Sequence, residues 1–159
     1  MPHDLLRFPY TLGMRDGFAK SNRVPSESNS EVRVPVASET DLIAARRKGR
    51  LMAEELGLSP TDATLVAAAI SELARNIVHY AEKGEILIRV VRNGHRHGVT
   101  IEARDEGPGI ADTRLAAQEG SSSFGGLGLG LSGVRRIMDQ FDITSQPGRG
   151  TTITVTKWR

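Results

Sequence analysis

The chain has 159 residues, of which 38% are hydrophobic and 25% charged, as expected of one soluble globular domain with its own core. Its formal net charge is only +2, so no overall field marks a nucleic-acid binder, although the sequence pI is about 9.3. The lack of cysteine excludes disulfides, zinc–thiolate sites and a cysteine nucleophile. We find neither an export signal nor an apolar run long enough to span a membrane, and therefore expect a cytoplasmic protein.

The first elements follow an irregular N-terminal segment. Residues 1–31 have no period that could bury a face, and we predict a disordered or loosely docked extension. The stretch EVRVPV alternates valine with other residues and predicts an edge strand, because Pro35 cannot donate a ladder hydrogen bond. Ser38 followed by Asp41 resembles a capping box, and Gly57 supplies the end of a first predicted helix.

A second helix is predicted from the stretch SPTD, with Ser59 as the cap and Pro60 at the first helical position. We expect this helix to end near Gly84. Apolar residues recur along it at steps of three and four and would line one face: Val66, Ile70, Leu73, Ile77 and Tyr80. Glu72 and Asn76 lie four residues apart on an adjoining strip, one turn above the other.

The second half of the chain reads mainly as strands. EILIRVVRN and GVTIEARDE are predicted strands joined by the turn NGHRH. Asp105 shares strand parity with apolar neighbours, so the pleat aims its carboxylate at the apolar side, where it needs a partner. A short helical piece around DTRLAAQE, a glycine-rich run, the helix LSGVRRIMDQF and two strands around the turn PGRG complete the chain. These runs predict an α+β fold, a two-layer sandwich of one mixed or mostly antiparallel sheet with helices packed on one face.

The glycine-rich run GGLGLGLSG leads directly into a predicted helix. Unblocked backbone N–H groups and the positive end of a helix dipole suit a phosphate chain. Taken alone, the run fits a flexible surface loop equally well. It is not a P-loop, because GxxxxGK[ST] is missing, and it does not follow a strand as a dinucleotide fingerprint does.

Four motifs occur in a meaningful order: Glu72 and Asn76 on a helix, DEGPG leaving a strand, the glycine-rich run, and Gly150-Thr151 opening the last strand. Together they resemble the GHKL (Bergerat-fold) superfamily of ATP-binding domains. Within that superfamily, AISELARNI, DEGPGI, GGLGLGL and GRGTTI are similar to the small bacterial serine/threonine kinases of the anti-sigma type. The resemblance covers residues 32–159, which we expect to form one ATP-binding kinase domain.

The resemblance implies ATP and Mg²⁺ as cofactors and assigns roles to individual residues. Glu72 would act as general base on the attacking hydroxyl, and Asn76 would offer its side-chain oxygen to Mg²⁺. Asp105 would accept a hydrogen bond from the adenine amino group and repel the carbonyl of guanine, with Thr151 as a second contact to adenine, directly or through water. The other implied nucleotide contacts comprise three residues beside the base and three at the triphosphate: Gly107, Gly109 and Ile110, then Gly126, Gly128 and Gly130.

Plain structural explanations stay open for several of these residues. Glu72 could be a solvated glutamate paired with Arg75 or Arg46, and Asn76 a mid-helix asparagine bonded locally. Thr151 also fits ordinary β-propensity. A basic group on the first helix is by default a solvated face, with docking to an acidic partner as the alternative: Arg46, Arg47, Lys48 and Arg50.

The resemblance implies an ATP-dependent serine/threonine protein kinase that phosphorylates a STAS-domain partner and acts as a partner switch in stress or sigma-factor signalling. A regulatory phosphatase or a sigma factor would be a further partner, and neither nucleic acid nor a membrane is expected. Two alternatives remain from different classes of function. One is an anti-sigma factor that sequesters a sigma subunit, and the other is a nucleotide-gated binding module without catalysis.

Overall fold

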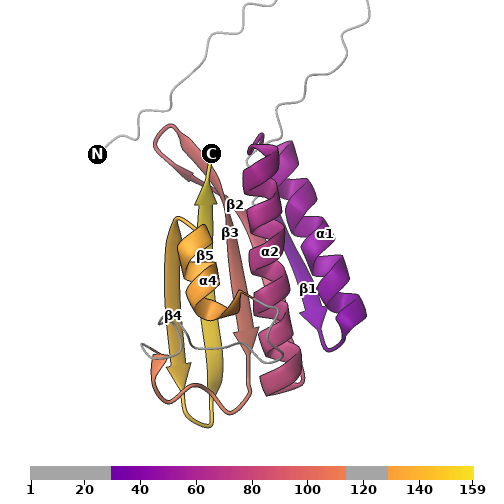
Figure 1. Cartoon of the computed structure of the whole chain (residues 1–159), viewed down its shortest axis with the longest axis vertical. Coiled ribbons are helices and arrows are strands. Elements are labelled where there is room, and N and C mark those ends of the chain that lie inside the picture. The colour runs from indigo at the N-terminus through magenta and orange to yellow at the C-terminus, as the bar shows by residue number, and fades with distance from the viewer. Residues whose placement is uncertain (1–29, 114–128) are drawn as a thin grey trace, which may run out of the picture.

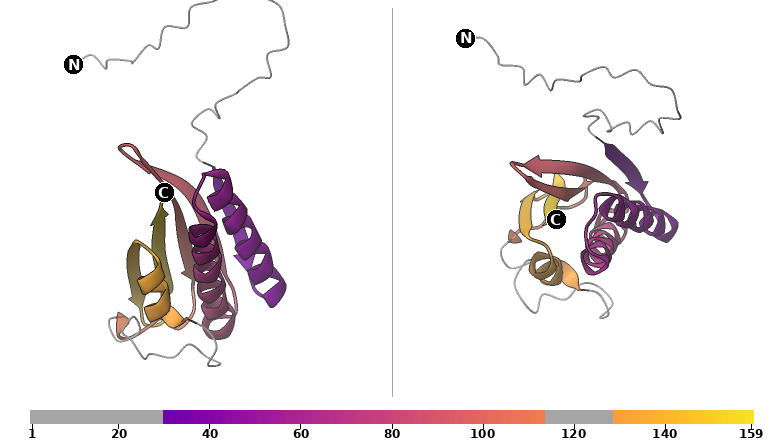
Figure 2. Two further views of the ribbon diagram at one scale, coloured as in Figure 1. Left: turned by 45° about the horizontal axis from the view of Figure 1, so that its top comes forward. Right: turned by 90° about the horizontal axis from the view of Figure 1, so that it is seen from above.

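The computed structural model describes residues 30–113 and 129–159. In chain order the elements are β1 (Glu31–Val36), α1 (Glu39–Glu55), α2 (Pro60–Asn76), the π-helix η1 (Ile77–Ala81), β2 (Gly84–Asn93), β3 (Arg96–Asp105), α4 (Gly130–Ile137), β4 (Gln140–Gln146) and β5 (Gly150–Trp158). The strands form a five-stranded sheet of order β1-β2-β3-β5-β4, and every pairing in it is antiparallel. Figures 1 and 2 show α1, α2 and α4 on the same side of this sheet. The predicted two-layer α+β fold is therefore confirmed.

The first two helices begin where their caps predict. The Ser38 hydroxyl accepts a hydrogen bond from the backbone N–H of Asp41 at 3.3 Å, and the Asp41 carboxylate accepts from the backbone N–H of Ala37 at 2.9 Å. The Ala37 bond and then the Ser38 hydroxyl hold the pKa of Asp41 below its usual value. Gly57, at φ +85°, follows the end of α1, and the Ser59 hydroxyl caps α2.

The core lies between the sheet and the helices, with α2 at its centre. The predicted apolar face of α2 is buried up to Ile77, whose side chain is 1% exposed. Tyr80 was expected on the same face, and that expectation is wrong because its side chain is 52% exposed. A π-helix replaces the α-helix after Asn76, and its wider turn changes the direction of the residues that follow. The helical segment therefore ends at Ala81, and Gly84 already belongs to β2.

The fourth helix is shorter than the stretch LSGVRRIMDQF predicts. It ends at Ile137, Met138 is extended, and β4 begins at Gln140. The backbone N–H of Asp139 donates to the carbonyl of Thr156 at 2.9 Å, so pairing with β5 takes over the chain where the helix would have continued.

The face of the sheet away from the helices carries a network of paired charged side chains. Arg89 donates to Glu31 and, at 2.9 Å, to Glu102, and Arg104 also donates to Glu102. The bond to Glu31 and then the bond to Glu102 raise the pKa of Arg89. Leu87 belongs to the same face and is fully buried, so these paired charged side chains cover apolar surface without a second layer of helices.

Several expectations lie outside the described residues. They concern the N-terminal extension up to residue 29, most of the short helix around DTRLAAQE, and two of the glycines, Gly126 and Gly128. Among the helices that the structure does describe, none has both the length and the apolar character needed to cross a membrane.

Candidate functional site

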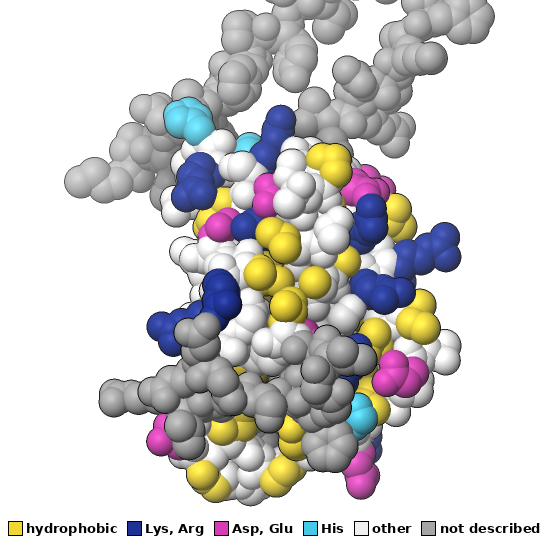
Figure 3. All heavy atoms as spheres, viewed as in Figure 1, with side chains coloured by type: hydrophobic (Ala, Val, Ile, Leu, Met, Phe, Trp, Pro, Cys, Tyr) yellow, Lys and Arg dark blue, Asp and Glu magenta, His cyan; other side chains and the backbone are white. Residues whose placement is uncertain are grey.

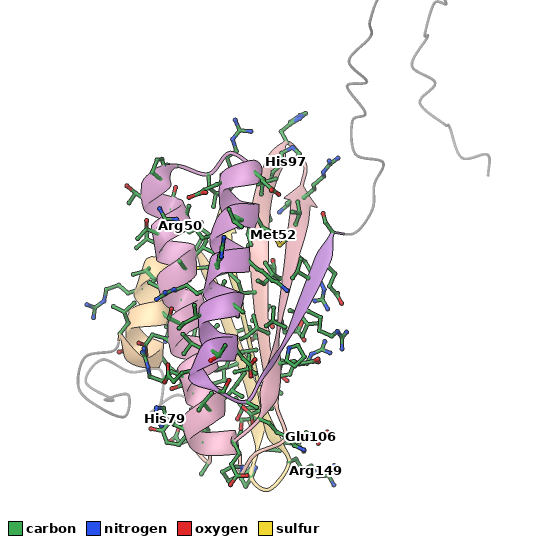
Figure 4. The ribbon with its side chains drawn as sticks, turned by 90° about the vertical axis from the view of Figure 1, so that its right-hand side faces the viewer. Arg50, Met52, His79, His97, Glu106 and Arg149 are labelled. Atoms are coloured by element: carbon green, nitrogen blue, oxygen red, sulfur yellow. The ribbon has the colours of Figure 1, made fainter. Side chains whose placement is uncertain are left out.

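Those predicted site residues that the structure describes come from four segments that meet at one end of the molecule (Figure 1). These segments are the end of α2 with η1, the loop after β3, the start of α4 and the β4–β5 turn. Figure 4 shows His79 of η1, Glu106 after β3 and Arg149 of the β4–β5 turn at this end. The sheet itself joins two of the segments, because Asp105 at the end of β3 pairs with Thr151 at the start of β5.

Asp105 and Thr151 are neighbours across the strands on the side of the sheet that faces the helices. Asp105 is half-buried, and its Oδ1 accepts a hydrogen bond from the backbone N–H of Gly107 at 2.9 Å. Within the described part of the chain, Oδ2 has no hydrogen-bond partner. Thr151 is only 7% exposed. The pair therefore offers a carboxylate oxygen without a partner among the described residues, beside a buried hydroxyl.

The loop after β3 lies so close to its neighbours that side chains are excluded at two positions. A Cβ on Gly107 would lie 2.6 Å from the Cβ of Ala81 in η1. Gly109 has φ +74°, and a Cβ there would lie 2.3 Å from the carbonyl oxygen of Gln146. Both glycines thus allow the loop to pack closely against η1 and the end of β4.

Ser145 of β4 contacts two of the predicted site residues and was not itself predicted from the sequence. Its Oγ accepts from the backbone N–H of Ile110 at 2.7 Å and lies 3.0 Å from the carbonyl oxygen of Gly150 and 2.9 Å from Oγ1 of Thr151. The strand alternation that predicted the inward direction of Asp105 could also have predicted that of Ser145. Ser145 shares the parity of two partly buried apolar residues of β4: Phe141 and Ile143.

Glu72 is buried, with 3% of the residue exposed, so it is not a solvated side chain, whereas the alternative's pairing with Arg75 is observed. Its Oε1 accepts from Nη1 of Arg75 at 2.6 Å, and its Oε2 accepts from the backbone N–H of Gly130 at 3.2 Å. Gly130 lies 58 positions further along the chain, at the first residue of α4 with φ +64°. Arg75 balances the buried charge, and each carboxylate oxygen keeps a lone pair that can accept a proton.

Asn76 is the last residue of α2 and is half-buried. It stands one turn beyond Glu72, and η1 begins directly after it; π-turns are frequent at functional sites. No group of three or more His, Asp or Glu side chains in residues 30–113 and 129–159 could hold a metal ion. The amide oxygen of Asn76 fits Mg²⁺ as a single protein ligand, because Mg²⁺ usually takes most of its ligands from water and substrate phosphates.

The basic group on α1 stands apart from this site. All four of its members are exposed: Arg46, Arg47, Lys48 and Arg50. Figure 3 shows basic side chains along the edge that α1 forms, whereas the four segments of the site meet at the lower end of the molecule in Figure 1. Arg50 pairs with Glu54 one turn further along at 2.9 Å.

Comparison with known proteins gives the class of this fold and site. The family model described as "Histidine kinase-, DNA gyrase B-, and HSP90-like ATPase" matches residues 61–159, and the chain belongs to this family. It is 47% identical over 130 residues to the serine/threonine-protein kinase RsbT of Bacillus subtilis (strain 168), covering 82% of this chain and 98% of that protein. The resemblance expected from the four motifs is therefore confirmed, including the anti-sigma type.

More distant relatives have the same fold or related names. The anti-sigma F factor of Bacillus subtilis (strain 168) is 36% identical over 109 residues, covering 63% of this chain and 73% of that protein. A solved structure of the RsbU and RsbW domains of Rv1364c from Mycobacterium tuberculosis matches with a TM-score of 0.54 at 19% identity. That match covers 81% of this chain and 33% of the other chain, and it supports the fold alone.

Proposed function

We propose that this protein is an ATP-dependent serine/threonine protein kinase that phosphorylates a STAS-domain partner and acts as a partner switch in stress or sigma-factor signalling. The observation that carries the proposal is the 47% identity to the kinase RsbT along nearly all of that protein's length. The site supports it, because the buried carboxylate of Glu72 and the amide of Asn76 lie at the same end of the domain as the paired residues Asp105 and Thr151.

The nucleotide base is bound at the sheet half of the site. The open Oδ2 of Asp105 accepts a hydrogen bond from the 6-amino group of adenine, and Thr151 lies beside it. Gly107 and Gly109 let the loop beside the base pack closely against η1 and β4. Ile110 is partly buried against the core and offers an apolar contact to the base.

The helix half of the site serves phosphoryl transfer. Mg²⁺, when bound with ATP through Asn76, neutralises charge on the phosphates. Glu72 takes the proton of the partner's serine or threonine hydroxyl on one carboxylate oxygen, while the bond from Arg75 orients the carboxylate. The backbone N–H of Gly130 holds the other oxygen of Glu72, and Gly126 and Gly128, which lie outside the described residues, are proposed as further contacts to the triphosphate.

A second function is favoured by one specific observation. The 36% identity to an anti-sigma F factor supports capture of a sigma subunit as the alternative. Incubation with radiolabelled ATP, Mg²⁺ and a panel of STAS-domain proteins, run beside a pull-down with sigma factors, separates the two. Label on a STAS-domain protein is the expected result. Nucleotide-dependent capture of a sigma subunit, with label on no STAS-domain protein, would overturn the proposal in favour of the anti-sigma factor.

A further inference from the structure

Ser145 lies behind the residues proposed to contact the base, and neither the motifs nor the relatives' names give it a role. We propose that Ser145 is a positioning residue for nucleotide choice. Its Oγ accepts a hydrogen bond from the hydroxyl of Thr151. Thr151 and Asp105 therefore offer the base only hydrogen-bond acceptors. The inference rests on the proposed function, because it requires ATP to bind beside these two residues.

The direction of each hydrogen bond follows from counting protons. A serine hydroxyl has one proton to donate and two lone pairs to accept with. The N–H of Ile110 can only donate and the carbonyl of Gly150 can only accept, at 2.7 Å and 3.0 Å from Oγ. The Ser145 proton therefore goes to Gly150. One lone pair is left, and Thr151 at 2.9 Å must donate into it.

The opposite arrangement leaves a repulsive contact. If Ser145 donated to Thr151, its lone pairs would face the carbonyl oxygen of Gly150 at 3.0 Å without a proton between the two oxygens. Gly150 cannot easily move away, because its backbone passes close to β3: a Cβ on Gly150 would lie 2.0 Å from the carbonyl oxygen of Asp105. The three contacts of Ser145 are satisfied together only when Thr151 donates.

A ligand that approaches Thr151 and Asp105 therefore meets hydrogen-bond acceptors on both residues. The proton of Thr151 is used on Ser145, and Asp105 is an acceptor whose Oδ1 is already engaged by Gly107. The exocyclic group at position 6 of a base is bound well by this pair only if it donates. The 6-amino group of adenine donates, whereas the 6-carbonyl of hypoxanthine or guanine would face acceptors without a proton between them.

Ser145 also supports the loop, and an experiment must separate that role from nucleotide choice. Its bond to Ile110 joins the loop to β4, and the backbone N–H of Gly148 donates to the carbonyl of Pro108 at 2.7 Å in the same region. Loosening the loop would lower the binding affinity for every nucleotide by the same factor. A change in the preference between two bases is a readout that a purely structural role would not move.

The test measures dissociation constants of ATP and ITP, because the base of ITP carries a 6-carbonyl in place of the 6-amino group. In Ser145→Ala the Thr151 proton is free to turn toward the ligand and donate to that carbonyl. We expect the ratio of the ITP to the ATP dissociation constant to fall about tenfold, the size of one hydrogen bond gained or left unmade. Ser145→Thr keeps a hydroxyl and should keep the ratio. Thr144→Ala, which removes an exposed hydroxyl on the opposite face of the same strand, is the matched control.

Ser145→Cys covers the case in which the alanine variant does not fold by circular dichroism. A thiol preserves volume but bonds weakly, so the same fall in the ratio is expected. Equal weakening of ATP and ITP, with an unchanged ratio in the folded variant, would overturn the inference and leave the proposed kinase intact. A wild-type protein that binds no ATP would overturn both.

Discussion

Replacing Glu72 with glutamine should separate phosphoryl transfer from nucleotide binding. Glutamine has nearly the same shape, and its carbonyl oxygen can still accept from the backbone N–H of Gly130. Its NH₂ group would face the guanidinium of Arg75, so the 2.6 Å charge-assisted bond is lost. Such bonds contribute about 1.5 to 3 kcal/mol. The side chain of Arg75 is 32% exposed and can turn to water, so we expect the lower end, about 1.5 kcal/mol, as the loss in free energy of unfolding.

Turnover should fall much further than stability suggests. A general base typically contributes about 10²-fold or more, which corresponds to roughly 2.7 kcal/mol of barrier. ATP affinity should stay within about threefold, because the role proposed for Glu72 is on the partner's hydroxyl and not on the nucleotide. The assay is single-turnover transfer of label at saturating ATP, beside an ATP titration and a thermal scan. Glu54→Gln is the matched control, since Glu54 also pairs with an arginine on its helix but is exposed. Turnover of Glu72→Gln within tenfold of wild type would refute the assignment of the base.

Three further predictions concern metal binding, backbone geometry and pH. Asn76→Ala should weaken Mg-ATP binding and abolish transfer, and its ATP affinity should no longer respond to removal of Mg²⁺ by EDTA; a response as large as that of wild type would exclude Asn76 as a ligand. Gly150→Ala should cost at least about 2 kcal/mol, because φ is +107° and its Cβ would clash with Asp105, whereas Gly148→Ala, at φ +77° with open space around it, should cost about 1 kcal/mol in denaturant unfolding. Asp41 has a lowered pKa, so its contribution to stability is present above about pH 4 and is lost as pH falls through the lowered value. Asp41→Asn should therefore unfold at a lower temperature at pH 7 and show a smaller change between pH 7 and pH 3; an unchanged pH response would contradict this.

The elements that the sequence predicted well are those fixed by local chemistry. Ser38 and Ser59 cap their helices through bonds to the third residue beyond, and Pro60 starts a helix without a donor to lose. Strand parity is equally local. It predicted the buried side of β3 and the position of Asp105, because successive side chains in a strand alternate between faces.

The errors arise where distant parts of the chain compete for the backbone. Met138 ends α4 because β4 pairs with β5, and no residue next to Met138 announces that pairing. The π-turn that exposes Tyr80 is likewise invisible in a periodic pattern. The same holds for the site. The order of the motifs predicted the family, but the bond from Gly130 to Glu72 and the contacts of Ser145 depend on how the sheet and helices pack.

The two halves of the site are built on different supports, and this difference has functional consequences. Asp105 and Thr151 are held by ladder pairing and by Ser145, and the adjoining loop packs against β4 without room for a side chain. Glu72 is instead held by Arg75 on its own helix and by the backbone N–H of Gly130, the first residue of α4, so only the second contact joins two helices. Strand pairing fixes the positions of Asp105 and Thr151 and the directions of their hydrogen bonds, which suits the proposed discrimination between bases. A carboxylate held by one ion pair and one backbone N–H keeps a lone pair on each oxygen for a substrate hydroxyl, which suits the proposed proton transfer. Changes in the sheet half should therefore alter which nucleotide binds, and changes in the helix half should alter how fast its phosphate is transferred.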